Sequence, residues 1–171
     1  ELEECGKFHD QLREAVARVS ENLVERDTES RLVVLGMLAG EHILFIGLPG
    51  TAKSQLGRRL SQLCGGPFFQ RLLTKFTTPE EIFGPLSLSA LENDEYRRVT
   101  KGFLPQASIA FLDEIFKANS AILNTLLTIL NERQFDNGQV RETCPIRCVI
   151  AASNELPEDS GELEALYDRF L

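Results

Sequence analysis

The stretch IGLPGTAKSQLG, Ile46–Gly57, joins an apolar segment to a helical one and decides the fold. The preceding residues Ile43–Ile46 are all apolar, which is typical of a short strand buried on both faces. In Gly47–Ser54 a glycine is followed by five residues and then by Lys-Ser, and leucine spacing predicts a helix over Ser54–Cys64. Such a strand–loop–helix directs backbone N–H groups at one point, so it favours an anionic polyphosphate there.

Individual loop residues have separate expected roles. Lys53 is expected to neutralise β- and γ-phosphate oxygens, and Ser54 to offer its hydroxyl to Mg²⁺. Ala52 stands where such loops usually carry a third glycine, but there the loop enters the helix and φ is commonly negative. We therefore expect the alanine to be tolerated. The other expected phosphate-binding positions are Gly47, Pro49, Gly50, Thr51 and Gln55.

A second signal is the segment SIAFLDEIF, which brings two carboxylates to the end of a buried strand. Asp113 and Glu114 would repel each other there unless a cation or a polarised water uses them, and ligands of open α/β sheets bind at this edge. Asp113 is placed to hold magnesium through water, and Glu114 to orient and deprotonate an attacking water. Asn154 ends the next buried strand in the same manner. Its amide either holds the attacking water or the γ-phosphate, or it simply caps the turn before Pro157.

The rest of the chain predicts an α/β fold with a mostly parallel sheet. Helical spacing covers the first forty residues, with a second helix over Arg31–Ala39. Apolar residues from Ile122 to Leu130 mark an amphipathic helix that is capped near Asn119 or Ser120. Two segments interrupt the alternation and predict inserted β-hairpins, 85–99 around an Asn-Asp turn and 133–147 around Asn137-Gly138. The further predicted strands are Phe68–Leu73, Ser108–Leu112 and Ile146–Ala152.

Composition narrows the class of protein. The chain has 171 residues, 43% of them hydrophobic and 26% charged, which is a globular balance. Its net charge of −8 disfavours unspecific binding to nucleic acid, and no apolar run is long enough to span a membrane. The cysteines at 5, 64, 144 and 148 lack metal-site spacing, so we expect free thiols in a reducing, cytoplasmic compartment. The acidic start is not a secretory signal, although a lost targeting peptide stays open.

With these motifs in place, the sequence resembles the AAA+ ATPases, and within them the MoxR group and its RavA-like members. The resemblance runs from about Leu23 to Leu171 through GLPGTAKS, GFLPQASIAFLDEIF, VIAASNELP and EALYDRF. It implies that residues 1–171 form an AAA+ nucleotide-binding core, a three-layer P-loop NTPase fold with residues 1–40 as N-terminal helices. It further identifies 85–99 as a helix-2 insert and 133–147 as a pre-sensor-1 hairpin. The family's helical lid is expected to lie outside this sequence.

The resemblance also implies roles for single residues. Gly47–Ser54 matches the Walker A motif, Ile109–Glu114 the Walker B motif and Asn154 sensor 1. Arg169 matches the arginine finger that reaches the nucleotide of a neighbouring subunit. ATP or ADP with Mg²⁺ is the implied cofactor. Residues 22–27 correspond to the segment that passes the adenine base in such proteins.

Three functions remain open from the sequence. The first is a chaperone-like ATPase that remodels protein clients, working as a hexameric ring with a partner carrying a von Willebrand factor A-type domain. The second is a DNA-directed motor using the cations of the two insertions, which neighbouring acids offset. The third is a scaffold that binds nucleotide without hydrolysing it. A GTPase is disfavoured because no Asn-Lys-x-Asp motif occurs.

Overall fold

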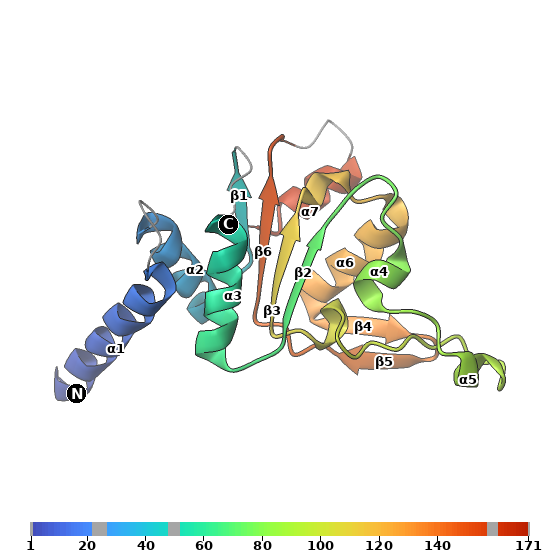
Figure 1. Ribbon diagram of the computed structural model, residues 1–171, viewed down its shortest axis with the longest axis horizontal. Coiled ribbons are helices and arrows are strands. Elements are labelled where there is room, and N and C mark those ends of the chain that lie inside the picture. The colour runs from blue at the N-terminus through green and yellow to red at the C-terminus, as the bar shows by residue number, and fades with distance from the viewer. Residues whose placement is uncertain (1, 22–26, 48–51, 157–160, 171) are drawn as a thin grey trace.

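The computed structural model describes residues 2–21, 27–47, 52–156 and 161–170, which form a three-layer α/β structure (Figure 1). Its central sheet has four parallel strands in the order β1-β6-β3-β2. This confirms the predicted fold class. The first strand has the predicted limits, and the limits of the other three differ by one or two residues. The strands are β1 (Ile43–Ile46), β2 (Phe68–Leu72), β3 (Ile109–Asp113) and β6 (Cys148–Ser153).

Helices cover both faces of the sheet. One face carries α1 (Leu2–Ser20), α2 (Asp27–Ala39) and α3 (Ala52–Cys64). The opposite face carries α4 (Pro79–Phe83), α6 (Ser120–Glu132) and α7 (Gly161–Tyr167). The helix predicted over Arg31–Ala39 begins earlier, at Asp27, because acidic residues in the first turn suit the positive end of a helix.

Strand β3 shows how the sequence builds two cores at once. Successive side chains of a strand point to opposite faces, so Ile109 and Phe111 pack with the α3 residues Leu56 and Leu60. Ala110 and Leu112 pack on the other face with the leucines and isoleucines of α6. All four β3 side chains are buried, and this explains why the strand reads as a continuous apolar run.

The predicted hairpin at Asn137-Gly138 forms, whereas the one at 85–99 does not form as predicted. Strands β4 (Gln134–Asn137) and β5 (Val140–Thr143) pair antiparallel. Within 85–99 the pairing is reduced to a single bridge, Leu86 with Arg98, around a short helix α5 (Leu88–Leu91). The Ser87 hydroxyl accepts a hydrogen bond from Ala90 N at 3.3 Å, and this local cap favours a helix over a strand.

The two insertions are joined by Asn137, whose side chain is only 2% exposed. Its Oδ1 accepts from Arg98 N at 2.6 Å, and its Nδ2 donates to Arg98 O at 3.1 Å and to Glu142 Oε1 at 2.8 Å. Gly138 follows with φ +67°, and a Cβ there would lie 2.4 Å from Tyr96 O. Only glycine permits that close approach. The hairpin and the 85–99 insertion are therefore in direct contact.

Two short 3₁₀ turns complete the described elements, η1 (Leu104–Gln106) and η2 (Ile115–Lys117).

In the described residues, Cys64, Cys144 and Cys148 are free thiols, and no cluster of three or more His, Cys, Asp or Glu side chains could hold a metal. Burial raises the pKa of Cys144 to about 11 and that of Cys148 to about 12. The same residues include no helix with the length and apolar character needed to cross a bilayer.

His42, which directly precedes β1, connects that strand to β6 and α6. Its Nδ1 accepts from Val149 N on β6 at 3.0 Å, so Nε2 carries the proton and donates to Leu130 O of α6 at 3.0 Å. Burial lowers the pKa of the imidazole, and the nearby Arg133 charge lowers it further, while the Leu130 carbonyl and Glu41 oppose the shift. The neutral ring is therefore part of the folded structure.

This burial predicts a loss of stability in acid. The unfolded chain, whose histidine pKa is about 6.5, binds a proton before the folded chain does. The free energy of unfolding should therefore fall as pH drops below about 6.5, by at most about 1.4 kcal/mol per pH unit, until the folded pKa is reached. Urea unfolding at pH 8 to 5 measures this slope. His42→Gln should flatten the profile and His9→Gln should not; equal slopes for both variants would contradict the assignment.

Candidate functional site

The predicted phosphate loop and the predicted carboxylates meet at one edge of the sheet. Ile46 pairs with Ser153, and Gly47 N donates to Ser153 O at 3.0 Å. On the other side of β6, Leu112 pairs with Ala151, so Asp113 ends its strand at the same edge. Neighbouring strands lie about 4.8 Å apart, which puts the ends of β1 and β3 roughly 10 Å from each other.

The described part of the loop is compatible with the anion site that the sequence predicts. Gly47 has φ +142° and open space where a Cβ would stand, a backbone conformation that favours glycine. Ala52 is the first residue of α3, so its backbone is helical, as the steric argument expected. Pro49, Gly50 and Thr51 lie outside the described residues. The site is therefore defined here by Gly47 and the first turn of α3.

Lys53 lies against the loop rather than in open solvent. It is 9% exposed, and its Nζ donates to Gly47 O at 3.3 Å. Ser54, in the next position, is half-buried, and Gln55 is exposed. The ammonium group thus sits at the turn that the backbone N–H groups of α3 face, which adds its charge to the positive end of the helix.

Glu114 has a backbone conformation that residues other than glycine rarely adopt. Its φ and ψ are 53° and 46°, the left-handed helical region. Glu114 N donates to Asp113 Oδ1 at 3.0 Å, and the Asp113 carbonyl accepts from Leu73 N at 2.9 Å. Such a conformation costs about 1–3 kcal/mol and is concentrated at functional sites. Here it turns the Glu114 side chain away from the direction that β3 would have given it.

Glu114 lines a hollow of about 330 Å³ at the carboxyl edge of the sheet. Glu114 is 9% exposed, and Lys117 Nζ lies 3.4 Å from its Oε2. The sequence did not single out Lys75, Lys117 or Ser153, which line the same hollow. A signal for Ser153 was available, because the Ser-x-Glu pattern forms a local turn in which its Oγ accepts from Glu155 N at 3.2 Å.

The hollow beside Glu114 is separate from the one that the α3 residues line. Ser54 and Gln55 line a second hollow of about 490 Å³ along α3, together with Arg58. The segment that connects β1 to α3 lies outside the described residues. The strand pairing, and not a shared cavity, is the observation that brings the two halves of the site to one edge.

Asn154 and Arg169 have different relations to this edge. Asn154 is exposed in the bend directly after β6, beside the Gly47 turn. Arg169 is also exposed, but the next residue, Phe170, pairs in parallel with His42 at the opposite end of β1. At about 3.3 Å per residue, the five steps from His42 to Gly47 place the Phe170 end roughly 17 Å from the Gly47 end. The structure does not bring Arg169 to the site of its own chain.

A magnesium nucleotide fits the donors at this edge. Ser54 and Asp113 offer the hard oxygen ligands that Mg²⁺ prefers, and Mg²⁺ usually adds water and substrate phosphates to one or two protein oxygens. The open space at Gly47 and the Lys53 ammonium suit phosphate oxygens.

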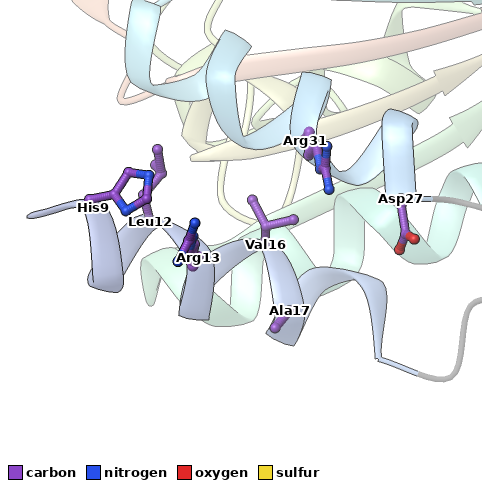
Figure 2. A pocket seen from close by; sticks show the side chains of 7 residues that line it. All are labelled: His9, Leu12, Arg13, Val16, Ala17, Asp27 and Arg31. Carbon is purple, nitrogen blue, oxygen red and sulfur yellow. The ribbon is translucent and has the colours of Figure 1, made fainter.

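A third hollow lies between α1 and α2 and has a volume of about 490 Å³ (Figure 2). None of the predicted catalytic, phosphate-binding or metal-binding residues lines it. Asp27, at the end of the segment predicted to pass the adenine, is one of its lining residues, while residues 22–26 lie outside the described part. The side chains that line it are His9, Leu12, Arg13, Val16, Ala17, Asp27 and Arg31.

The parallel sheet, with a strand–loop–helix and an acidic strand end at one edge, has the architecture of a P-loop NTPase core, and the family comparison places the chain among the AAA+ ATPases of the MoxR group. A family model described as the MoxR domain in the MoxR-vWA-beta-propeller ternary systems matches residues 10–171, and the chain belongs to that family. The narrower RavA-like assignment stays a prediction.

Relatives agree with this assignment. Two uncharacterised proteins of Methanocaldococcus jannaschii are each 52% identical over 149 residues, which cover 86% of this chain and 39% and 40% of theirs. Chaperone MoxR1 of Mycobacterium tuberculosis is 26% identical over 168 residues, or 94% of this chain and 42% of that protein. The chain thus spans about two fifths of the length of these relatives.

A solved structure shows the same fold. A candidate ATPase from Cytophaga hutchinsonii superposes with a TM-score of 0.73 at 23% identity, covering 96% of this chain and 50% of that one. At this identity the likeness concerns the fold alone. It supports the α/β architecture independently of the sequence motifs.

Proposed function

We propose that this chain is the ATP-binding and ATP-hydrolysing core of a MoxR-type AAA+ protein that remodels protein complexes in a chaperone-like way. The observation that carries the proposal is the meeting of the Gly47 turn and the Asp113–Glu114 strand end at one edge of the sheet. Membership of the MoxR family supports nucleotide as the ligand.

Nucleotide binding is assigned to the loop and the first turn of α3. The backbone of Gly47, Pro49, Gly50, Thr51 and Ala52 would surround the phosphates, and Gln55 would lie at the rim. Lys53 would neutralise the β- and γ-phosphate oxygens, and Ser54 and Asp113 would hold Mg²⁺. The ion, when bound, supplies charge neutralisation between the β- and γ-phosphates.

Hydrolysis is assigned to three further residues. Glu114 would orient a water and accept its proton, with Lys117 holding the carboxylate at 3.4 Å. The Asn154 amide would hold the same water or a γ-phosphate oxygen. Arg169, which lies at the other end of β1 from its own site, would serve the site of a second copy. Its guanidinium is suited to spreading negative charge off a transferring phosphoryl group.

Assembly and partners extend the proposal to the whole protein. A ring, which we propose is hexameric, would bring Arg169 of one copy to the nucleotide of the next. The family description names MoxR-vWA-beta-propeller systems, which supports a partner with a von Willebrand factor A-type domain. The Chaperone MoxR1 relative supports a protein client, and we propose a cytoplasmic setting.

The insertions give little support to a DNA-directed motor. Three of their arginines are paired with acids, among them Arg97 with Glu95 at 3.8 Å and Arg98 with Glu80 at 3.3 Å. Arg141 contacts Asp136 at 2.7 Å, and their hydrogen bond lowers the pKa of the aspartate. Because these charges are compensated, little positive surface is left for phosphates.

Phosphate release by the full-length protein tests the proposal. Lys53→Ala removes the charge beside the loop, so we expect nucleotide binding to weaken roughly 30- to 100-fold and turnover to disappear at moderate ATP. Lys101→Ala, an exposed lysine between α5 and η1, should leave both unchanged. Calorimetric titration and steady-state phosphate release measure the two effects. Wild-type turnover no higher than that of Lys53→Ala would refute the proposal that the protein hydrolyses ATP. The alternative of a scaffold that binds nucleotide without hydrolysing it would then remain.

A further inference from the structure

Helix α3 is basic in a protein whose net charge is −8. Residues 52–64 contain Lys53, Arg58 and Arg59 and no acidic residue. Arg58 lies one helical turn beyond Ser54, so the two side chains share a face of α3. Both line the polar hollow of about 490 Å³ along this helix. A cationic side chain therefore stands beside the magnesium end of the proposed site.

Arg58 and Arg59 have different surroundings. Arg59 Nη1 donates to Val19 O at 3.2 Å and also contacts Glu21 O, so it fastens α1 to α3. Arg58 is exposed, donates to the neutral Gln70 Oε1 at 3.3 Å and lies 5.9 Å from the centre of the Phe68 ring. These contacts hold the guanidinium in place without neutralising it. Arg58 is the available charge of the two.

The segment that carries Arg169 has the opposite charge. Glu164 and Asp168 are exposed, and Asp168 N donates to Glu164 O at 3.0 Å, so they lie one turn apart on the same side of the segment. Among the described residues, no opposite charge lies within 4.0 Å of Arg58, Glu164 or Asp168. Within the described part of the chain, each of these charges is therefore without an ion pair.

These two charged surfaces cannot meet within one molecule. Helix α3 packs in the core on one face of the sheet, and α7 packs through Leu166 in the core on the other face (Figure 1). A contact between α3 of one copy and α7 of another joins two different surfaces. Such a contact does not close between two copies and repeats around a ring.

We propose that Arg58 forms ion pairs with Glu164 and Asp168 of a second copy, and that this contact delivers Arg169 to the site. The inference rests on the proposed function, since it takes Arg169 to act on the neighbouring nucleotide. When Arg169 reaches the Ser54 end of α3, Asp168 and Glu164 lie within one to two turns of Arg58. The acidic segment then serves as the positioning element for the catalytic arginine, and its partner is a second copy of this chain.

Charge exchange in the full-length protein tests the contact. Sedimentation velocity with ATP measures assembly of the wild type, of Arg58→Glu, of Glu164→Arg and of the double variant. Each single variant should weaken assembly roughly tenfold or more, because like charges then face each other in every interface. The double variant should recover most of the loss, because each interface again pairs opposite charges. Lys101→Glu, with the same charge change elsewhere, should assemble as the wild type does.

The outcomes separate this inference from the proposed function. Normal assembly of both single variants, or a double variant no better than either, would overturn the Arg58 contact and leave ATP hydrolysis standing. A wild type that hydrolyses ATP and never assembles would overturn the contact and also the proposed use of Arg169 between copies. Thermal unfolding of each variant shows that it is folded, and Glu164→Arg tests the contact even if Arg58→Glu disturbs α3.

Discussion

Glu114→Gln is expected to bind ATP as tightly as the wild type and to hydrolyse it roughly 10²- to 10⁴-fold more slowly. Glutamine has the same length and can hydrogen-bond a water, but its amide cannot accept the proton. The left-handed backbone at Glu114 is equally costly for both side chains, so replacing one by the other should not change folding. The effect should therefore be confined to the rate of the chemical step.

Single-turnover phosphate release and nucleotide titration separate the rate from the affinity. Glu14→Gln, an equivalent change at an exposed position of α1, is the matched control and should behave as the wild type. If Glu114→Gln lost nucleotide affinity while its chemical rate was unchanged, Glu114 would be a ligand-binding residue and the base would lie elsewhere.

The elements that frame the site were predictable because their signals are local. Strands β1, β3 and β6 read as largely apolar runs, and the Gly47–Ser54 spacing predicted the helix that follows it. Asp113 and Glu114 could be assigned to the sheet edge because the carboxyl ends of parallel strands all lie at the same edge of a sheet. The sequence also predicted the hairpin at Asn137-Gly138, whose turn residues tolerate positive φ.

What could not be predicted depends on contacts distant in the sequence or on weak local preferences. The alternation in residues 85–99 suggested two strands, but Leu88 and Leu91 also have helical spacing. The Ser87 side chain caps the first turn of α5 and so stabilises the helix. Nothing local indicates that Glu114 adopts a left-handed backbone, since glutamate has no preference for it. The distance between Arg169 and its own site follows only from the pairing of Phe170 with His42.

Arg169→Ala is expected to lower turnover by roughly 10³-fold or more while leaving nucleotide binding by each subunit nearly unchanged. The residue is exposed and lies at the opposite end of β1 from Gly47, so its removal should not disturb the site of its own chain. Arg169→Lys should recover little activity, because an ammonium cannot make the paired contacts of a planar guanidinium.

Mixing variants shows whether Arg169 acts between subunits. An Arg169→Ala subunit has an intact Lys53, and a Lys53→Ala subunit has an intact Arg169. In mixed rings about a quarter of the sites would combine both, because the contact is head-to-tail and each site takes residues from two neighbours. The mixture should therefore hydrolyse ATP far faster than either variant alone. Replacing the Lys53→Ala partner with Lys53→Ala/Arg169→Ala should abolish the gain. Mass measurement shows separately whether subunits exchange between rings. If mixed rings form and the mixture is no more active than the sum of its parts, Arg169 lies outside the catalytic machinery.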